Sequence, residues 1–354
     1  MYRFDNPKKK SRSNRMSSPQ SLPESARNWV RILAKYREPS LKRSSFELAV
    51  SAIPFAVLAV LAWLSLSVSY WLAFGLALLN GLFLVRLFII QHDCGHGSFF
   101  GNRHANNWVG RIIGVFTMTP YKVWRRTHSI HHSASGNLGK RGIGDVYTLT
   151  VKEFEALPRY KRIAYRIYRS PVFMFGFAPA LLFVVQNRVP LSMMRSWEYW
   201  MSAMGTNAMI ATMIAAILWF GGLAPLLLIF VPTLLLAATL GVWLFYVQHQ
   251  FENAQWDESE DWELHDAALK GSSYYVLPGV LRWFSGNIGV HHVHHLYSRI
   301  PFYRLMEVLR DHSALANLNR MTIRDSLKSA RMQLWDEGSR KLVSFSQARK
   351  LRAA

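Results

Sequence analysis

Cysteine is almost absent from this chain of 354 residues, which contains one, Cys94. A single cysteine excludes an intramolecular disulfide and a metal site built on several thiolates, and it fits a protein that faces a reducing compartment. Acidic residues are also scarce, with 21 Asp and Glu against 42 Lys and Arg and a formal net charge of +21. In a soluble protein this excess would indicate a nucleic-acid partner, because Lys and Arg neutralise phosphates.

Charge is missing altogether between Tyr199 and Val247, and hydrophobic residues make up 51% of the chain. Four apolar runs are long enough to cross a hydrocarbon core of about 30 Å as helices. They are residues 49–67, 70–90, 203–220 and 223–246, and we expect them to form two helical hairpins. A shorter run, residues 171–186, is expected to lie in the membrane interface. The sequence therefore predicts an all-α integral membrane protein with four transmembrane helices.

Basic residues gather outside the spans, with twelve Lys or Arg against three acids in residues 1–46. Such segments stay on the cytosolic side and meet anionic headgroups. We expect a basic cytosolic arm (1–46), a membrane domain with a cytosolic helical cap (47–310) and a basic cytosolic tail (311–354). Arg86, near the end of the second span, is expected to snorkel to the interface. We expect no cleavable signal peptide, and an organellar transit peptide stays open as an alternative.

Nine of the 13 histidines fall into three tight groups, at residues 92–96 (HDCGH), 128–132 (HSIHH) and 291–295 (HHVHH). Spacings of three and four residues place side chains on one face of a helix. His292 falls off that face, so we expect it to stay out of any site. His249 follows the fourth span as His92 follows the second, which makes it a candidate for a ninth ligand.

Neutral imidazole is a ligand that suits iron, zinc, copper and nickel. One zinc ion needs only three or four ligands, so eight or nine nitrogens predict a site for two metal ions with positions left for water or O2. Metal-bound histidines usually donate their second ring nitrogen to an acid or an amide. The candidates for that role are Asp93, Asn137, Asp145, Glu252, Asn253 and Asn287. We interpret His104, His265 and His312 as structural residues.

The three groups resemble the three histidine boxes of the membrane fatty acid desaturase superfamily. The resemblance runs from about Trp71 to Leu309 and covers the order of the boxes, their spacing from the spans and the four-span layout. Within the superfamily, the chain is most similar to the bacterial and cyanobacterial acyl-lipid desaturases of the methyl-end (omega-6, delta-12) type. The similar segments are residues 92–99, 124–128, 136–146, 245–252 and 286–291.

The resemblance implies two iron ions that work with O2 to desaturate an acyl chain of a membrane lipid at the delta-12/omega-6 position. It implies a location in the bacterial cytoplasmic membrane, and these ligands: His92, His96, His128, His131, His132, His249, His291, His294 and His295. The His-Pro-Gly-Gly signature of a fused cytochrome b5 is absent from the sequence. We therefore expect electrons from a separate protein, by resemblance a ferredoxin, which a basic surface would suit.

Two alternative functions stay open at this point. The same histidines would support hydroxylation or ketolation of another lipid, such as an alkane, a sphingolipid or a carotenoid, although the loop at residues 136–146 favours acyl-lipid desaturation. A metal transporter with histidine-rich cytosolic loops belongs to a different class. Transporters need polar or ionisable residues inside their spans, and these spans contain almost none.

Overall fold

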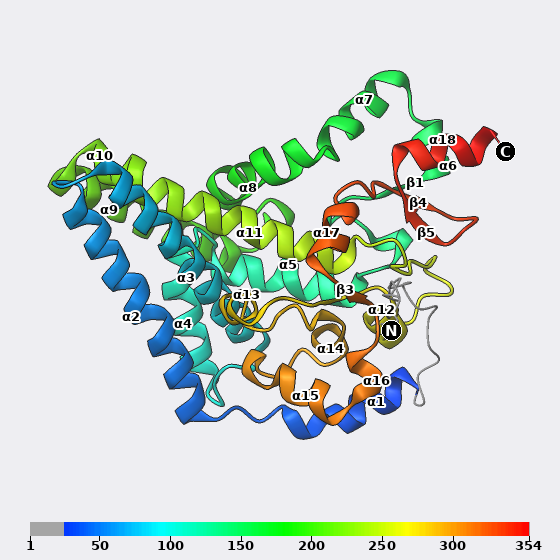
Figure 1. Ribbon diagram of the computed structural model, residues 1–354, viewed down its shortest axis with the longest axis horizontal. Coiled ribbons are helices and arrows are strands. Elements are labelled where there is room, and N and C mark those ends of the chain that lie inside the picture. The colour runs from blue at the N-terminus through cyan, green and yellow to red at the C-terminus, as the bar shows by residue number, and fades with distance from the viewer. Residues whose placement is uncertain (1–24, 354) are drawn as a thin grey trace, which may run out of the picture.

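The computed structural model describes residues 25–353, and its four longest helical segments are long and apolar enough to cross a bilayer. They are α2 (Leu41–Ser65), α3 (Tyr70–His96), α9 (Trp197–Gly221) and the continuous segment Leu223–His249, which comprises α10 (Leu223–Pro225), η7 (Leu226–Phe230) and α11 (Val231–His249). The helices form two hairpins whose far corner is the turn between α9 and α10 (Figure 1). The prediction of a mostly helical protein with four spans is confirmed, although α2 and α9 begin earlier than the apolar runs do.

Serine side chains begin both helices of the first hairpin. The Ser40 hydroxyl accepts a hydrogen bond from the backbone N–H of Arg43, and the Ser69 hydroxyl accepts one from Leu72. Each bond satisfies a donor that the first turn of a helix leaves free. α3 ends at His96 and is capped by Gly97, whose φ of 69° is a left-handed conformation that glycine adopts without strain. The group at residues 92–96 therefore forms the last turn of a membrane span.

Residues 159–188 form a helix that is broken by a bend of 54°. Its first part is α7 (Arg159–Tyr168), and its second part consists of η3 (Phe173–Phe177), α8 (Ala178–Ala180), η4 (Leu181–Val185) and η5 (Gln186–Arg188). The second part packs along α11, where the Thr239 hydroxyl donates to the carbonyl of Phe175 at 3.1 Å. By length and composition the bent pair would count as a fifth span if it crossed the membrane. The location of residues 171–186 in the membrane interface stays a prediction.

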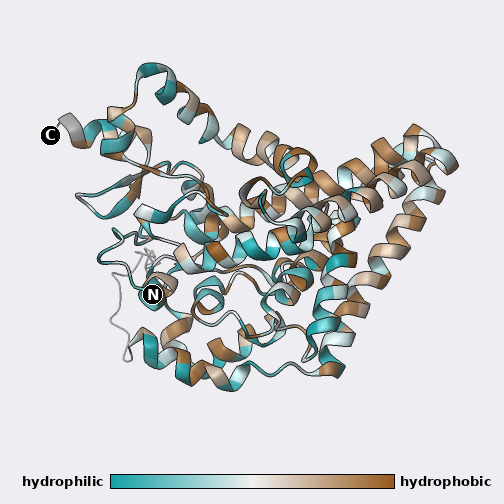
Figure 2. Ribbon diagram, turned by 180° about the vertical axis from the view of Figure 1, so that it is seen from behind, coloured by the Kyte–Doolittle hydropathy of each residue, from teal (hydrophilic) through white to brown (hydrophobic). Residues whose placement is uncertain are grey.

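Short helices make up most of the polar cap, which contrasts with the apolar hairpins in Figure 2. They are α1 (Ala26–Leu33), η1 (Ala34–Tyr36), α4 (Arg103–Phe116), α5 (Tyr121–Ala134), η2 (Leu138–Lys140), α6 (Val151–Ala156), η6 (Leu191–Met193), α12 (Leu264–Lys270), α13 (Gly279–Phe284), α14 (His291–Leu296), η8 (Phe302–Arg304), α15 (Leu305–Asp311), α16 (Ser313–Ala316), α17 (Ile323–Ser329) and α18 (Phe345–Ala353). α1 and α18 both lie at the cap end, away from the α9–α10 corner (Figure 1).

Two small sheets join the end of the chain to the cap. β1 (Leu149–Thr150) is parallel to β4 (Leu334–Asp336), which is antiparallel to β5 (Lys341–Val343). β2 (Tyr274–Tyr275) is parallel to β3 (Arg320–Met321). Residues 311–353, the described part of the expected tail (311–354), thus pack against the cap and bury the side chain of Trp335. The first 24 residues of the predicted basic arm lie outside the described residues.

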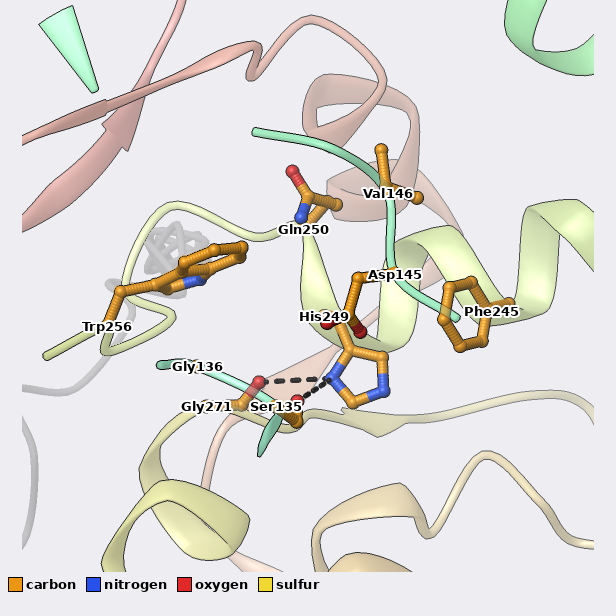
Figure 3. A pocket seen from close by; sticks show the side chains of 9 residues that line it. All are labelled: Ser135, Gly136, Asp145, Val146, Phe245, His249, Gln250, Trp256 and Gly271. Carbon is orange, nitrogen blue, oxygen red and sulfur yellow. Dashed lines mark hydrogen bonds between the residues drawn. The ribbon is translucent and has the colours of Figure 1, made fainter. Parts of the chain in front are cut away.

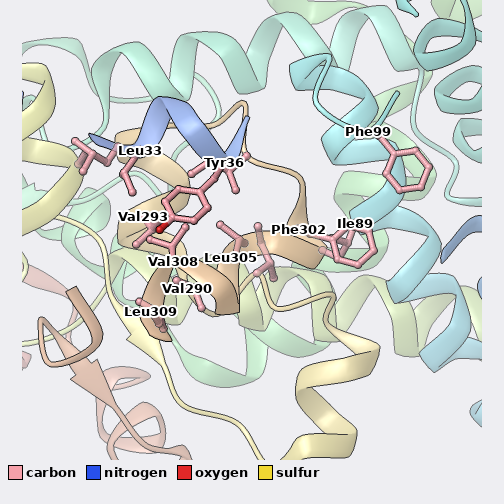
Figure 4. Packing of buried hydrophobic residues seen from close by; sticks show 14 of the residues in the cluster. Leu33, Tyr36, Ile89, Phe99, Val290, Val293, Phe302, Leu305, Val308 and Leu309 are labelled. Atoms are coloured by element: carbon pink, nitrogen blue, oxygen red, sulfur yellow. The ribbon is translucent and has the colours of Figure 1, made fainter. Parts of the chain in front are cut away.

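The largest apolar cluster packs α1 and α15 against α14, the helix that carries the third histidine group (Figure 4). Leu33, Val293, Leu305 and Val308 are fully buried in it. Burial of each such side chain stabilises the fold by about 1.5–3 kcal/mol. This packing fixes α14 at the base of the spans, although α14 has only six residues and would not be stable alone.

Arg86 does not snorkel to the interface as predicted. Its side chain is 2% exposed and forms an ion pair with the buried carboxylate of Glu47 on α2. The guanidinium also donates to the Ser51 hydroxyl at 3.0 Å and lies 3.8 Å from the ring centre of Trp283 on α13. The pair connects both helices of the first hairpin to the cap. Sequence reasoning missed it because the partner acid lies 39 residues away.

Candidate metal centre

Four elements bring the predicted histidines to one place. His92 and His96 end α3, His249 ends α11, and the other two groups lie on α5 and α14. Because two spans end at the same site as two cap helices, all four elements meet on one side of the hairpins. Six of the nine side chains are buried, and His96, His128 and His132 are partly buried.

The nine side chains separate into two groups in which the candidate ligand atoms all lie within 4.8 Å of one another. The first group consists of His92, His96, His128, His132 and His294. The second group consists of His131, His249, His291 and His295. The structure thus divides the nine histidines in a way that sequence reasoning could not.

Nitrogen-to-nitrogen distances within each group fit a shared metal ion. In the first group, the Nε2 atom of His128 lies 3.0 Å from that of His96 and 3.1 Å from that of His132. In the second, the Nε2 atom of His249 lies 3.1 Å from that of His131 and 3.0 Å from that of His291. Two nitrogens bound at right angles about 2.1 Å from one ion are separated by about 3.0 Å. The donor set therefore fits two metal ions.

Burial keeps the imidazoles outside the spans in the form that binds metal. Loss of hydration, followed by the proximity of other histidines, holds the pKa of His128, His132 and His294 well below its ordinary value. The same causes, in the same order, lower the pKa of His291 and His295. Neutral imidazole has a free lone pair for a metal ion, whereas a protonated ring has none.

Two of the six predicted orienting residues contact histidines. Asp145 forms a short hydrogen bond with Nδ1 of His131. Asp93 lies 3.2 Å from Nδ1 of His92 and accepts a bond of 2.7 Å from the backbone N–H of Phe302. These contacts fix the ring orientation so that Nε2 faces the centre.

The other four predicted orienting residues make no hydrogen bond to a histidine in the described part of the chain. Asn137 accepts from the Ser259 hydroxyl, Glu252 pairs with Lys341, and Asn287 donates to the carbonyl of Phe302. Asn253 likewise makes no hydrogen bond to a histidine among residues 25–353. Proximity in sequence selected these residues, but Glu252, Asn253 and Asn287 lie in turns, and Asn137 forms a β-bridge with Asp257.

A small cavity lies beside His249 and supplies the partners that the sequence did not reveal (Figure 3). Nδ1 of His249 lies 3.4 Å from both the Ser135 hydroxyl and the carbonyl of Gly271. Asp145 and Phe245 also line the cavity, whose volume is about 10 Å³, close to that of a single water site. Ser135 and Gly271 belong to segments far from His249 in sequence, so no local pattern could have identified them.

Aromatic rings cover two of the histidines. The Trp124 indole stacks on His128 with ring centres 4.7 Å apart, and Phe245 lies 5.0 Å from the ring of His131. Trp124 precedes His128 by four residues, a spacing that places both side chains on one helix face. That spacing was the signal that sequence reasoning overlooked. The rings shield the imidazoles from water.

The remaining histidines lie outside both groups, as predicted. His292 turns away from the centre, and its Nε2 atom lies 3.0 Å from the carbonyl of Leu315. His312 lies 3.2 Å from the hydroxyl of Tyr36. His104 and His265 belong to neither group among the described residues.

The sequence matches the family described as Fatty acid desaturase over residues 69–326. The chain belongs to the fatty acid desaturase family. It is 41% identical over 326 residues to a fatty acid desaturase of Bacillus subtilis (strain 168), and the alignment covers 92% of each chain. As a member of this family the chain is an oxidoreductase, which decides against the metal transporter.

More distant desaturases also match. An sn-1 acyl-lipid omega-3 desaturase (ferredoxin) of Synechocystis is 28% identical over 64% of each chain. An acyl-lipid omega-3 desaturase (cytochrome b5) of the endoplasmic reticulum of Arabidopsis thaliana is 27% identical over 74% of this chain and 67% of its own. The family therefore includes desaturases with different electron donors.

Proposed function

We propose that this desaturase uses two iron ions, O2 and electrons from a separate protein to introduce a cis double bond into an acyl chain of a membrane lipid. The observation that carries the proposal is the convergence of nine imidazoles from four elements into two adjacent groups. Five ligands in one group and four in the other leave positions for O2 or water around octahedral ions.

Iron with O2 supplies an oxidising power that no side chain has, which dehydrogenation of an unactivated methylene requires. In the net reaction, two neighbouring methylenes lose one hydrogen each, the donor provides two electrons, two protons are taken up, and O2 is reduced to two water molecules. The residues of the chain bind, orient and shield. Asp93 and Asp145 fix the rings of His92 and His131, and Trp124 and Phe245 exclude water from the rings that they cover.

We place the new double bond at the delta-12 (omega-6) position, on the similarity to desaturases of the methyl-end type. The omega-3 names of the Synechocystis and Arabidopsis relatives make the neighbouring methyl-end position the competing result. Positional choice depends on holding one methylene at the centre, because a shift of about 1 Å changes which hydrogen is in reach.

We propose a ferredoxin as the electron donor and the cytosolic side of a bacterial cytoplasmic membrane as the location of the centre and of both termini. The net charge of +21 supports both parts. Basic segments stay on the cytosolic side of spans, and a basic surface attracts an acidic donor. A relative whose name specifies ferredoxin gives further support.

The test compares cells that express the wild type, His131→Ala or His265→Ala together with a ferredoxin. His131 belongs to the second group, whereas His265 belongs to neither, so the two variants remove the same ring from different places. We expect a diunsaturated chain from oleate in the wild type and His265→Ala, and none in His131→Ala, by gas chromatography–mass spectrometry with double-bond location. Bound iron should fall only in His131→Ala.

Other results would each change a different part of the proposal. Hydroxylated or ketolated lipid as the only product would replace desaturation with the alternative chemistry. A double bond at another position would correct the regiochemistry alone. Full activity of His131→Ala would refute the assignment of the centre.

A further inference from the structure

A second cavity lies between α5 and the start of α9 and is lined by two arginines. Arg126 of α5 and Arg195, just before α9, line it together with Leu191, Met193, Met194 and Tyr199. Its volume is about 490 Å³, far larger than the cavity beside His249. Both arginine residues are exposed.

Neither guanidinium group has an acidic partner in the part of the chain that the structure describes. Between residues 25 and 353, no ion pair involves Arg126 or Arg195, whereas neighbouring Lys122 pairs with Glu198 at 2.5 Å. Arg125, next along α5, donates to Asn107. The two positive charges that line this cavity are therefore not neutralised by an acid of the described chain, which favours an anion between them. Guanidinium groups bind phosphate oxygens through paired N–H donors.

The position along α9 places this cavity at the depth of lipid headgroups. Trp197 and Trp219 are 75% and 84% exposed, and tryptophan is enriched at both membrane interfaces. The two residues are separated by about 33 Å along a helix that rises about 1.5 Å per residue, close to the thickness of a hydrocarbon core. Arg195 lies just outside Trp197, on the side where the histidines converge.

We propose that this cavity binds the phosphodiester of the phospholipid whose acyl chain is desaturated, with Arg126 and Arg195 on the phosphate. The apolar side chains of Leu191, Met193 and Met194 cover the adjoining ester region. The assignment of the lipid as substrate rests on the proposed function. Arg126 precedes His128 by two residues, a rise of about 3 Å along α5, but the two side chains lie on different faces of that helix. The phosphate is therefore held at the level of the metal centre, across α5 from it.

Anchoring of the headgroup explains how a chain in the bilayer reaches a centre at the membrane surface. His92 and His249 end spans, so the target methylene has to rise from the hydrocarbon core to their level. A fixed phosphate limits how much chain lies between the ester and the centre. The cavity would therefore select phospholipid-bound chains over free fatty acids and neutral lipids.

The test uses the full-length iron-loaded protein and the double variant Arg126→Gln/Arg195→Gln. Arg349→Gln/Lys350→Gln is the matched control, because it removes the same charge from exposed positions on α18. Native mass spectrometry in detergent measures binding of palmitoyl-oleoyl phosphatidylglycerol and of palmitoyl-oleoyl glycerol, which lacks the phosphate. A desaturation assay with the same phospholipid in mixed micelles gives KM and kcat.

We expect the cavity variant to bind the phospholipid about tenfold more weakly or worse, because it loses two charge-assisted contacts. Its affinity for the diacylglycerol should not change, its KM should rise, and its kcat and iron content should stay near those of the wild type. The control variant should match the wild type. Arg126→Lys/Arg195→Lys, which keeps the charge, should recover part of the affinity.

Unchanged phospholipid binding in the cavity variant would overturn the inference, and so would an equal loss of diacylglycerol binding. Displacement of the phospholipid by millimolar inorganic phosphate alone would assign the cavity to free anions. Weaker binding with an unchanged KM would show that the bound lipid is not the substrate. Binding that depends on the arginines, without any product from the wild type, would instead refute the proposed function.

Discussion

Gly95, in the last turn of α3, leaves room for the ring of Trp124. A Cβ at this position would lie 2.7 Å from the Cζ3 atom of Trp124, and ordinary contact begins near 3.4 Å. Gly95→Ala must therefore move the indole by about 0.7 Å. The indole is confined by Phe88, at 5.5 Å, and by the stacked ring of His128. We expect the displacement to pass to His128 and so to the first metal group.

The size of the effect of Gly95→Ala on stability follows from two opposing contributions, and its effect on the rate follows from the displacement of a metal ligand. Alanine is favoured over glycine in a helix by about 1 kcal/mol, and overpacking costs about 1–3 kcal/mol. The net change is at most about 2 kcal/mol, so Gly95→Ala should fold. Metal sites tolerate changes in ligand distance of only about 0.2 Å, and misplacement near 1 Å costs about a hundredfold in rate.

The assay measures iron per protein chain and the rate of product formation in purified Gly95→Ala, with Gly75→Ala as the control. Gly75 lies on the same helix, and a Cβ there would meet nothing within 4 Å. We expect Gly75→Ala to keep full iron and activity. Gly95→Ala should melt near the wild type but lose most of its activity and part of its iron. Full iron and full rate in Gly95→Ala would refute the reasoning.

Three further predictions concern the surroundings of the centre. Asp145→Asn removes the charge that orients His131 and should weaken iron binding about 10- to 100-fold, measured by iron titration. Arg86→Met removes one of the two arginines that pair with the buried Glu47, while Arg43 keeps its ion pair, and should lower the free energy of unfolding by about 3 kcal/mol, measured by denaturation in detergent. Burial lowers the pKa of His292 from 6.5 to about 4. The unfolded chain therefore binds a proton more readily than the folded protein, and the folded state loses stability as the pH falls from about 6.5 to about 4. His292 should contribute about 3 kcal/mol to this loss, in addition to the contribution of the metal-centre histidines whose pKa is also lowered, and the melting temperature of the metal-free protein should stay constant above about pH 7.

The spans and the histidine groups could be predicted because both depend on local patterns. Long apolar runs and spacings of three and four residues are properties of single helices, and a helix keeps them whatever it packs against. His249 was predicted from its place after a span, and the structure puts it in the second group with His131. Its neighbours Ser135 and Gly271 were not predicted, because only the folded chain brings them close.

The parts that the sequence did not reveal are contacts between distant segments. The strands have two or three residues each, too few to show an alternating pattern. β4 is held instead by its pairing with β1, and Leu334 lies opposite Leu149 in that register. Asn137 and Asn287 illustrate the same limit, because nearness in sequence to a histidine does not determine where a side chain points.

The division of ligands between helices couples the two metal positions mechanically. α5 gives His128 and His132 to the first group and His131 to the second, and α14 likewise serves both with His294 and His295. A first ion that fixes either helix therefore also places ligands for the second, and removes part of the entropy that the second ion would have to overcome. The two ions should load cooperatively, and the protein with a single ion should be a minor species at every iron concentration.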